Sequence, residues 1–138
     1  MTAILRLAAV VIVIGCTPLL AHHSYAAFDR DKEVTLSGVV KEFQWNNPHA
    51  WIQVHVVDDK GRAVEWGIEC GSPNMMARTG WKSTTLKAGD KIVAVVNPLK
   101  DGRPNASLVK ITLADGKVLG PGNAPAPRPL GSSTRSKS

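Results

Sequence analysis

Two adjacent histidines, His22 and His23, are the residues of this chain best suited to metal chemistry. They follow Leu20-Ala21, which ends in a small residue of the kind found before a signal-peptide cleavage site. Cleavage there would give His22 an α-amine, and this amine and its imidazole could chelate one metal ion. Such nitrogen donors suit Cu(II) best and Zn(II) or Ni(II) less well, and an α-amine with a pKa of about 8 loses its proton readily near neutral pH. The sequence therefore predicts a site for copper or another transition metal, with a solvated N-terminus of incidental metal affinity as the alternative.

A third nitrogen ligand is needed to complete such a site, and the candidates are His23, His49 and His55. His49 follows the turn sequence Asn46-Asn47-Pro48, whereas His55 lies in the middle of a predicted strand. The distance of each from His22 depends on the fold, so the sequence leaves all three open.

The first 21 residues have the composition of a signal peptide. Arg6 supplies the positive charge, residues 7–14 form an unbroken apolar run, and Pro18 ends it. This run is much shorter than the roughly 20 apolar residues of a membrane-spanning helix, so we predict a periplasmic or secreted protein without a transmembrane span. The alternative is a lipobox at residues 13–16, in which Cys16 would be lipidated, would anchor the protein and would leave His22 without a free amine.

Alternating apolar and polar residues predict five strands, over residues 34–45, 50–58, 62–70, 91–97 and 106–113, and a last short segment at Val118. Between the third and fourth strands, Ser72-Pro73 begins a short helix that Gly80 ends. This element order is that of the OB-fold, a five-stranded Greek-key barrel. The predicted fold class is therefore all-β with one short helix, and Met75 or Met76 is expected to close one end of the barrel.

The connection between the second and third strands fixes which residues face each other. Asp59-Lys60-Gly61 fits a three-residue hairpin loop with Gly61 in the left-handed conformation. The apolar residues then share the inner face, and Cys70 among them is expected to be an inert core thiol without a disulfide partner. A slip of one residue would bury Glu65 and Glu69. On the outer face the register pairs Trp51 with Glu69, Gln53 with Gly67, and His55 with Glu65.

This outer face is the second candidate site, because OB barrels bind ligands on their second and third strands. Trp51, Gln53, Glu65 and Glu69 would form it. Trp51 would be a stacking platform unless the N-terminal lead-in (residues 22–31) or the C-terminal tail (residues 120–138) covers it. His55 and Glu65 could act together as metal ligands or as an acid–base pair, although such cross-strand pairs are more often modest surface contacts. Within the first strand, Gly38 is expected to mark a bulge or a strong bend.

The predicted domain organisation has three parts: a signal peptide over residues 1–21, the barrel with its N-terminal lead-in over residues 22–119, and a tail over residues 120–138. The tail is rich in Pro, Gly and Ser and is expected to be disordered. Of the formal net charge of +6, Arg6 carries one unit and the tail three, so the barrel domain has only about +2. No element concentrates basic residues, so nucleic acid is not an expected partner.

Several segments together identify a family resemblance: HHSYAAFD after the signal, LSGVVKEFQWNNPHAWIQVHV, GSPN, GW, LKAGDKI and ITLADG. The chain resembles a family of small exported proteobacterial proteins catalogued as domain of unknown function 6152. The resemblance covers about residues 22 to 117, and Tyr25 stands where the family usually has Phe. It implies a periplasmic or secreted location and a mature chain that begins at the paired histidines. It implies no established activity.

The sequence contains no nucleophile–base set, phosphate-binding loop or Cys-x-x-Cys pair, so we expect no enzymatic activity. The predicted function is that of an exported binding module, which binds copper or another transition metal through His22 and His23 with His49 or His55. The alternative is a module that binds an unidentified protein or small ligand on the Trp51 face without a metal.

Overall fold

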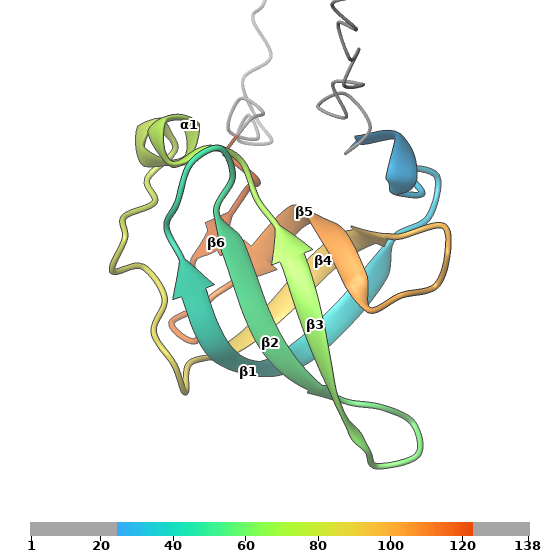
Figure 1. Ribbon diagram of the computed structural model, residues 1–138. Coiled ribbons are helices and arrows are strands. Elements are labelled where there is room, and N and C mark those ends of the chain that lie inside the picture. Colours follow the sequence, from blue (N-terminus) through green and yellow to red (C-terminus); the bar gives the residue numbers. More distant parts are fainter. Residues whose placement is uncertain (1–24, 123–138) are drawn as a thin grey trace, which may run out of the picture.

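The computed structural model describes residues 25–122, in which alternating apolar and polar side chains form strands that coil around one core (Figure 1). The elements in chain order are the 3-10 turn η2 (Tyr25–Ala27), β1 (Val34–Gln44), β2 (Trp51–Val57), β3 (Ala63–Glu69), α1 (Pro73–Arg78), β4 (Lys91–Pro98), β5 (Asn105–Thr112) and β6 (Val118–Leu119). No helix among these residues is long and apolar enough to cross a membrane.

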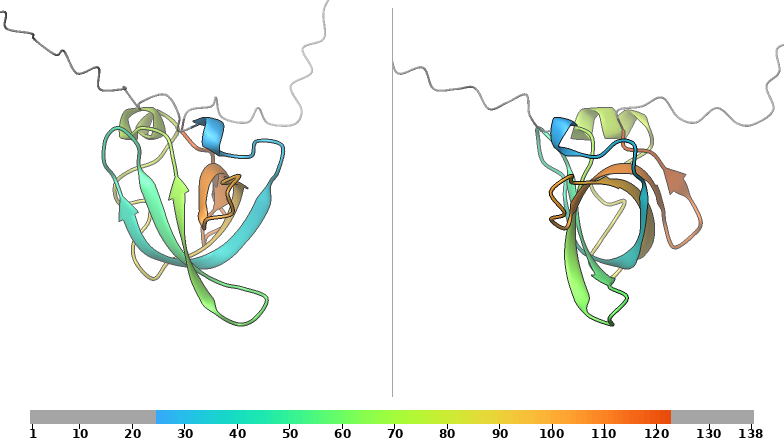
Figure 2. Two further views of the ribbon diagram at one scale, coloured as in Figure 1. Left: turned by 45° about the vertical axis from the view of Figure 1, so that its right-hand side comes forward. Right: turned by 90° about the vertical axis from the view of Figure 1, so that its right-hand side faces the viewer.

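The strands follow one another in the sheet in the order β3-β2-β1-β4-β5-β6, and β3 pairs a second time with β5. That last pairing is parallel and closes the sheet into a five-stranded barrel (Figure 2). β1 pairs with both β2 and β4, and α1 connects β3 to β4, which is the connectivity of an OB-fold. The predicted all-β barrel with one short helix is therefore confirmed.

The β2–β3 hairpin has the predicted register. Gly61 adopts a φ of 75° in the loop, and the Asp58 amide donates a hydrogen bond of 2.8 Å to the Arg62 carbonyl oxygen. Cross-strand partners are Val56 and Val64, Val54 and Trp66, and Ile52 and Ile68 on one face, and Trp51 and Glu69, Gln53 and Gly67, and His55 and Glu65 on the other. The loop length and the need to bury one apolar face therefore determine this register.

The core is filled from all five barrel strands, and its fully buried members include Ile52, Val54, Ile68, Val96 and Ile111. Burial of each such side chain contributes about 2 kcal/mol, so hydrophobic packing stabilises the fold. Cys70 is buried among these side chains as a free thiol, and desolvation raises its pKa far above the ordinary value. As predicted, Cys70 faces the core, an environment in which a cysteine is expected to be unreactive.

Helix α1 covers one end of the barrel. The Ser72 side chain caps it by accepting a hydrogen bond of 3.4 Å from the Met75 amide. Met76 is fully buried whereas Met75 is exposed, so Met76 is the methionine that closes the barrel. Trp81 follows, buried, and its indole nitrogen donates a hydrogen bond of 2.9 Å to the carbonyl oxygen of Gly120.

Two strand irregularities differ from the sequence-based expectation. The bulge in β1 lies at Lys41, between the pairs Val40–Val54 and Glu42–Gln53, and not at Gly38. Gly38 instead allows β2 to approach, because a Cβ atom there would lie 2.7 Å from Val54 Cγ2 and even closer to the His55 carbonyl oxygen. In β5, a second bulge at Val109 breaks the expected alternation, so that Leu108 and Ile111 both face the core.

The contacts of the barrel continue beyond residue 119. The Pro121 carbonyl oxygen accepts a hydrogen bond of 2.8 Å from the Gly71 amide. Gly122 lies against α1, where a Cβ atom would come within 2.8 Å of Met76 Cα. Residues 120–122, which composition assigns to the tail, therefore pack on the barrel; residues 123–138 lie outside the described part.

Candidate functional site

His49 and Glu69 form a pair at the end of the barrel. His49 lies two residues before β2, after the cis peptide bond of Asn47-Pro48, and Glu69 is the last residue of β3. Nδ1 of His49 contacts Oε1 of Glu69. The side chain of His49 is 28% exposed, but that of Glu69 only 8%. The pair therefore combines a partly accessible imidazole with a buried carboxylate.

The burial of Glu69 corrects the sequence-based expectation. The register does place Glu69 on the outer face, but barrel closure puts a strand on each side of it, with Trp51 of β2 opposite and Ser107 of β5 beside it. It is the one buried acidic or basic residue among residues 26–122. A buried carboxylate is costly unless it is paired, and His49 supplies such a partner.

The second histidine of the described residues has a different environment. His55 lies exposed on β2 opposite Glu65, but Glu65 is hydrogen-bonded to Nζ of Lys41, the bulged residue of β1, at 2.7 Å. That hydrogen bond is the main reason why the pKa of Glu65 lies below its ordinary value, and the charge of His55 makes a smaller contribution. All three side chains are exposed.

The predicted metal ligands do not all meet. In β2, Trp51 and His55 are about 13 Å apart along the strand. His49 precedes Trp51 and is therefore still farther from His55, so His49 and His55 cannot bind the same ion. His22 and His23 lie outside the described residues. Between residues 25 and 122, no three His, Cys, Asp or Glu side chains come together in a group that could hold a metal ion.

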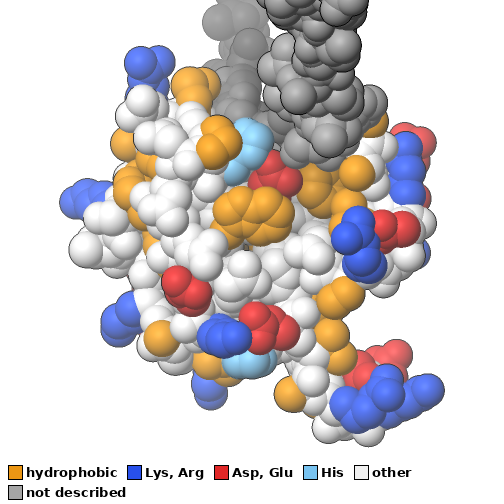
Figure 3. Space-filling view, in the orientation of Figure 1, with side chains coloured by type: hydrophobic (Ala, Val, Ile, Leu, Met, Phe, Trp, Pro, Cys, Tyr) orange, Lys and Arg blue, Asp and Glu red, His pale blue; other side chains and the backbone are white. Residues whose placement is uncertain are grey.

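Trp51 and Gln53 are half-buried on the outer face of β2, as the register requires. Figure 3 shows this side of the molecule, where acidic and basic side chains gather below a hydrophobic area. Asn105 also belongs to this face, although the sequence analysis did not identify it. Its side-chain oxygen lies so close to Gly67 that a Cβ atom on this glycine would overlap it, and Oε1 of Gln53 would be 3.4 Å from the same Cβ atom. The OB-fold pairing of the third and fifth strands is the signal that could have identified Asn105.

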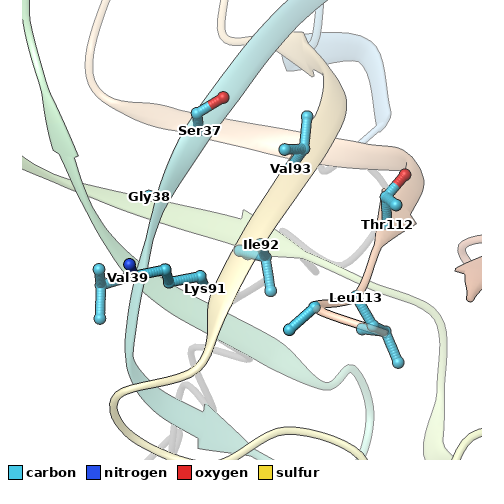
Figure 4. A pocket seen from close by; sticks show the side chains of 9 residues that line it. Ser37, Gly38, Val39, Lys91, Ile92, Val93, Thr112 and Leu113 are labelled. Carbon is cyan, nitrogen blue, oxygen red and sulfur yellow. The ribbon is translucent and has the colours of Figure 1, made fainter. Parts of the chain in front are cut away.

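A groove on another part of the barrel has a volume of about 400 Å³ and is lined mostly by β1, β4 and β5 (Figure 4). Val39 and Val93 form its exposed apolar surface, and Lys91 is its charged residue. None of the predicted site residues lines it. Its shallow apolar surface does not define a ligand.

The architecture defines the class of protein, a small OB-like β-barrel domain with a polar outer face over β2 and β3. The chain belongs to the family of unknown function DUF6152, whose model matches residues 9–107. The match confirms the resemblance found in the sequence and includes every residue predicted for the site. No curated protein and no solved structure matches the chain.

Proposed function

We propose that this protein is an exported, non-enzymatic binding module that binds copper or another transition metal at the barrel end that carries His49. The amine and imidazole of His22 and the imidazole of His49 are the proposed ligands, and His23 is a further candidate. Three nitrogen donors of this kind form a planar set that Cu(II) favours. The proposal requires cleavage after Ala21, as the composition of residues 1–21 predicts.

The position of His49 is the observation that supports this proposal. The lead-in attaches beside the β4–β5 turn, where the backbone amide of Lys100 donates a hydrogen bond of 3.0 Å to the Ala27 carbonyl oxygen. β5 begins after that turn and pairs with β3 as far as Glu69, the partner of His49. Figure 2 shows η2 and α1 at the same end of the barrel. Residues 22–24 add up to about 10 Å of chain before Tyr25, which is the segment that would bring His22 toward His49.

Copper titration of the mature protein tests this function. Protein exported by its native host is first analysed by intact mass, which distinguishes a chain that begins at His22 from one lipidated at Cys16. The chain that begins at His22 should bind one Cu(II) ion with submicromolar affinity. An alanine added before His22, or the substitution His49→Ala, should weaken binding strongly, whereas His55→Ala is the matched control and should not. Equal affinity of the extended and natural chains would refute the proposal.

A second candidate function, without a metal, is binding of a protein or small ligand on the outer face of β2 and β3. Two amide side chains, those of Gln53 and Asn105, each have their oxygen next to Gly67, on the same face as Trp51. Glu69 lies beside them, and Glu65 belongs to the far end of the same face. An amide offers both a donor and an acceptor, and an indole offers a flat apolar surface.

Trp51→Ala distinguishes this second candidate from a structural role of Trp51. A binding role predicts loss of the ligand with little change in the midpoint of urea unfolding. Unfolding of the variant instead would show that Trp51 is part of the packing.

A further inference from the structure

We infer that the outer face of β2, β3 and β5 binds a neutral saccharide, with one sugar ring packed against the indole of Trp51. This inference deepens the second candidate function and rests on it, because it names the class of small ligand that the face would take. It is independent of the copper site, since none of the groups that carry it is a proposed metal ligand.

Strand pairing arranges the outer face in rows that run from β2 through β3 to β5. Paired residues project from the same face of a sheet. The two rows where β5 closes the barrel are Trp51, Glu69 and Ser107, and Gln53, Gly67 and Asn105. Because Gly67 has no side chain, the amide oxygens of Gln53 and Asn105 can both lie next to it. The two rows therefore bring an indole, two amides and a hydroxyl group together on neighbouring strands.

These four polar groups have no partner within the described part of the protein. No residue between 25 and 122 forms a hydrogen bond with the indole nitrogen of Trp51 or with the side-chain amides of Gln53 and Asn105. The same holds for the hydroxyl group of Ser107, and all four residues are half-buried. Polar groups of this kind form hydrogen bonds with water or with a ligand. A ligand with both donors and acceptors would satisfy them together.

The charged side chains around these groups are already paired. Glu69 contacts His49 at the end of the barrel, and Glu65 accepts a hydrogen bond from Lys41 at the far end of the face. Neither of the two rows contains Lys or Arg, so they offer no cation to a phosphate or a nucleic acid. Figure 3 shows uncharged surface below the hydrophobic area, with acidic and basic side chains gathered further down. The groups that await a partner are therefore all neutral.

A sugar ring combines the properties that these groups require. Its C–H bonds form an apolar surface, which can pack against the flat apolar face of an indole. Its hydroxyl groups both donate and accept hydrogen bonds, as the amides of Gln53 and Asn105 do. A protein partner would need about 800 Å² on each side of a standard interface, more than four half-buried side chains expose. The arrangement therefore favours a short neutral saccharide.

The indole N–H signals of the mature chain report binding in a proton–nitrogen NMR titration. The probes are three neutral trisaccharides: maltotriose, cellotriose and chitotriose. The signal of Trp51, identified by its absence in Trp51→Phe, should move with at least one of them and saturate at millimolar concentration. The signal of Trp81 is the internal control and should stay, because that indole is buried and bonded to the Gly120 carbonyl oxygen.

Single substitutions test the amides. Gln53→Ala and Asn105→Ala should each weaken binding by about 2- to 10-fold, which corresponds to the loss of one hydrogen bond. Their urea midpoints should change little, because neither amide has a partner among residues 25–122. His55→Ala, on the same face of β2 but outside the two rows, is the matched control and should bind as tightly as the natural sequence. Trp51→Ala should abolish binding, and if it does not fold, the two amide variants decide the matter.

Charged probes separate this inference from the function on which it rests. Trigalacturonate, a trisaccharide with a carboxylate on each ring, and choline, an organic cation, should move the Trp51 signal less than the neutral probes do. An equal or larger response to either, or unchanged trisaccharide affinity in both amide variants, refutes the neutral saccharide and leaves the face as a binding surface. A Trp51 signal that moves with no probe, neutral or charged, refutes the inference together with small-ligand binding on this face.

Discussion

The barrel presents two histidine–glutamate pairs, and the fold builds them differently. His55 and Glu65 face each other directly across β2 and β3, and both are exposed. His49 and Glu69 are not cross-strand partners, because Trp51 occupies the position opposite Glu69. His49 instead contacts Glu69 from the connection that precedes β2.

The difference follows from the position of each glutamate relative to the barrel closure. β5 pairs with β3 only over Gly67, Ile68 and Glu69, so Glu69 has strands on both sides while Glu65 has only β2. Glu65 lies within reach of the bulged Lys41, which neutralises it at the surface. Exposed ion pairs contribute about 0–1 kcal/mol, whereas removal of one partner of a buried pair can cost about 3–5 kcal/mol. Barrel closure therefore makes one pair structurally and chemically significant and leaves the other a surface contact.

Gly38→Ala should have the largest effect on stability, because Gly38 lies against the backbone of β2 at His55, a member of the exposed pair. A Cβ atom at this position would overlap the backbone of β2 at His55, which cannot move without loss of the β1–β2 pairing. We expect the free energy of unfolding to fall by about 3 kcal/mol, measured by urea denaturation. A loss below about 1 kcal/mol would show that β1 can shift away from β2 and that the approach at Gly38 is not tight.

His49→Ala and His55→Ala compare the two pairs directly. Loss of His49 leaves the buried Glu69 carboxylate without this partner, and we expect a destabilisation of about 2 kcal/mol, reduced from the buried-pair value by the partial exposure of His49. His55→Ala should change the free energy of unfolding by less than about 0.5 kcal/mol. Urea denaturation of both variants at neutral pH measures these values. Equal, small losses would mean that Glu69 obtains its compensation from groups other than His49.

The hairpin register and the OB-like order of elements could be predicted from the sequence, because the strands, the hairpin loop and the short helix each have a local signal. Gly61 and the loop length determine the register of β2 and β3, and the apolar residues of those strands confirm it by their spacing. The bulges at Lys41 and Val109 had no such signal. Val109, Ile111 and Leu113 are apolar residues at a spacing of two, so the sequence pattern of a regular strand continues through Val109, although the backbone has an extra residue there.

The His49–Glu69 pair could not be predicted because it depends on two features outside local pattern. One is the path of residues 46–49, which brings the side chain of His49 into contact with Glu69, the last residue of β3. The other is the β3–β5 closure that buries Glu69. The sequence identified both residues as candidates but assigned them to different sites, His49 to the metal and Glu69 to the outer face.

Lys41→Met should have the smallest effect on stability, and its effect should be measurable as a change in the pKa of Glu65. The Lys41 hydrogen bond holds the pKa of Glu65 below its ordinary value of 4.5, and removal of the ammonium group should raise that pKa toward it. A carboxyl group with a lowered pKa in the folded state stabilises the protein above the pKa of the unfolded chain. This stabilisation is lost as the pH falls through the folded-state pKa, so Lys41→Met should remove this part of the acid dependence.

Carbon-detected NMR of the carboxyl groups between pH 2 and 7, a range of about five units around the reference pKa values, measures this effect. Asp58 is the internal control, because its pKa is lowered mainly by hydrogen bonds from Arg62 and should not move. His55→Ala should raise the Glu65 pKa less than Lys41→Met does, since the charge of His55 is the smallest of the causes. A larger rise in His55→Ala would show that His55 and Glu65 form a true pair. The exposed site would then resemble the buried one, and barrel closure would no longer explain the difference between them.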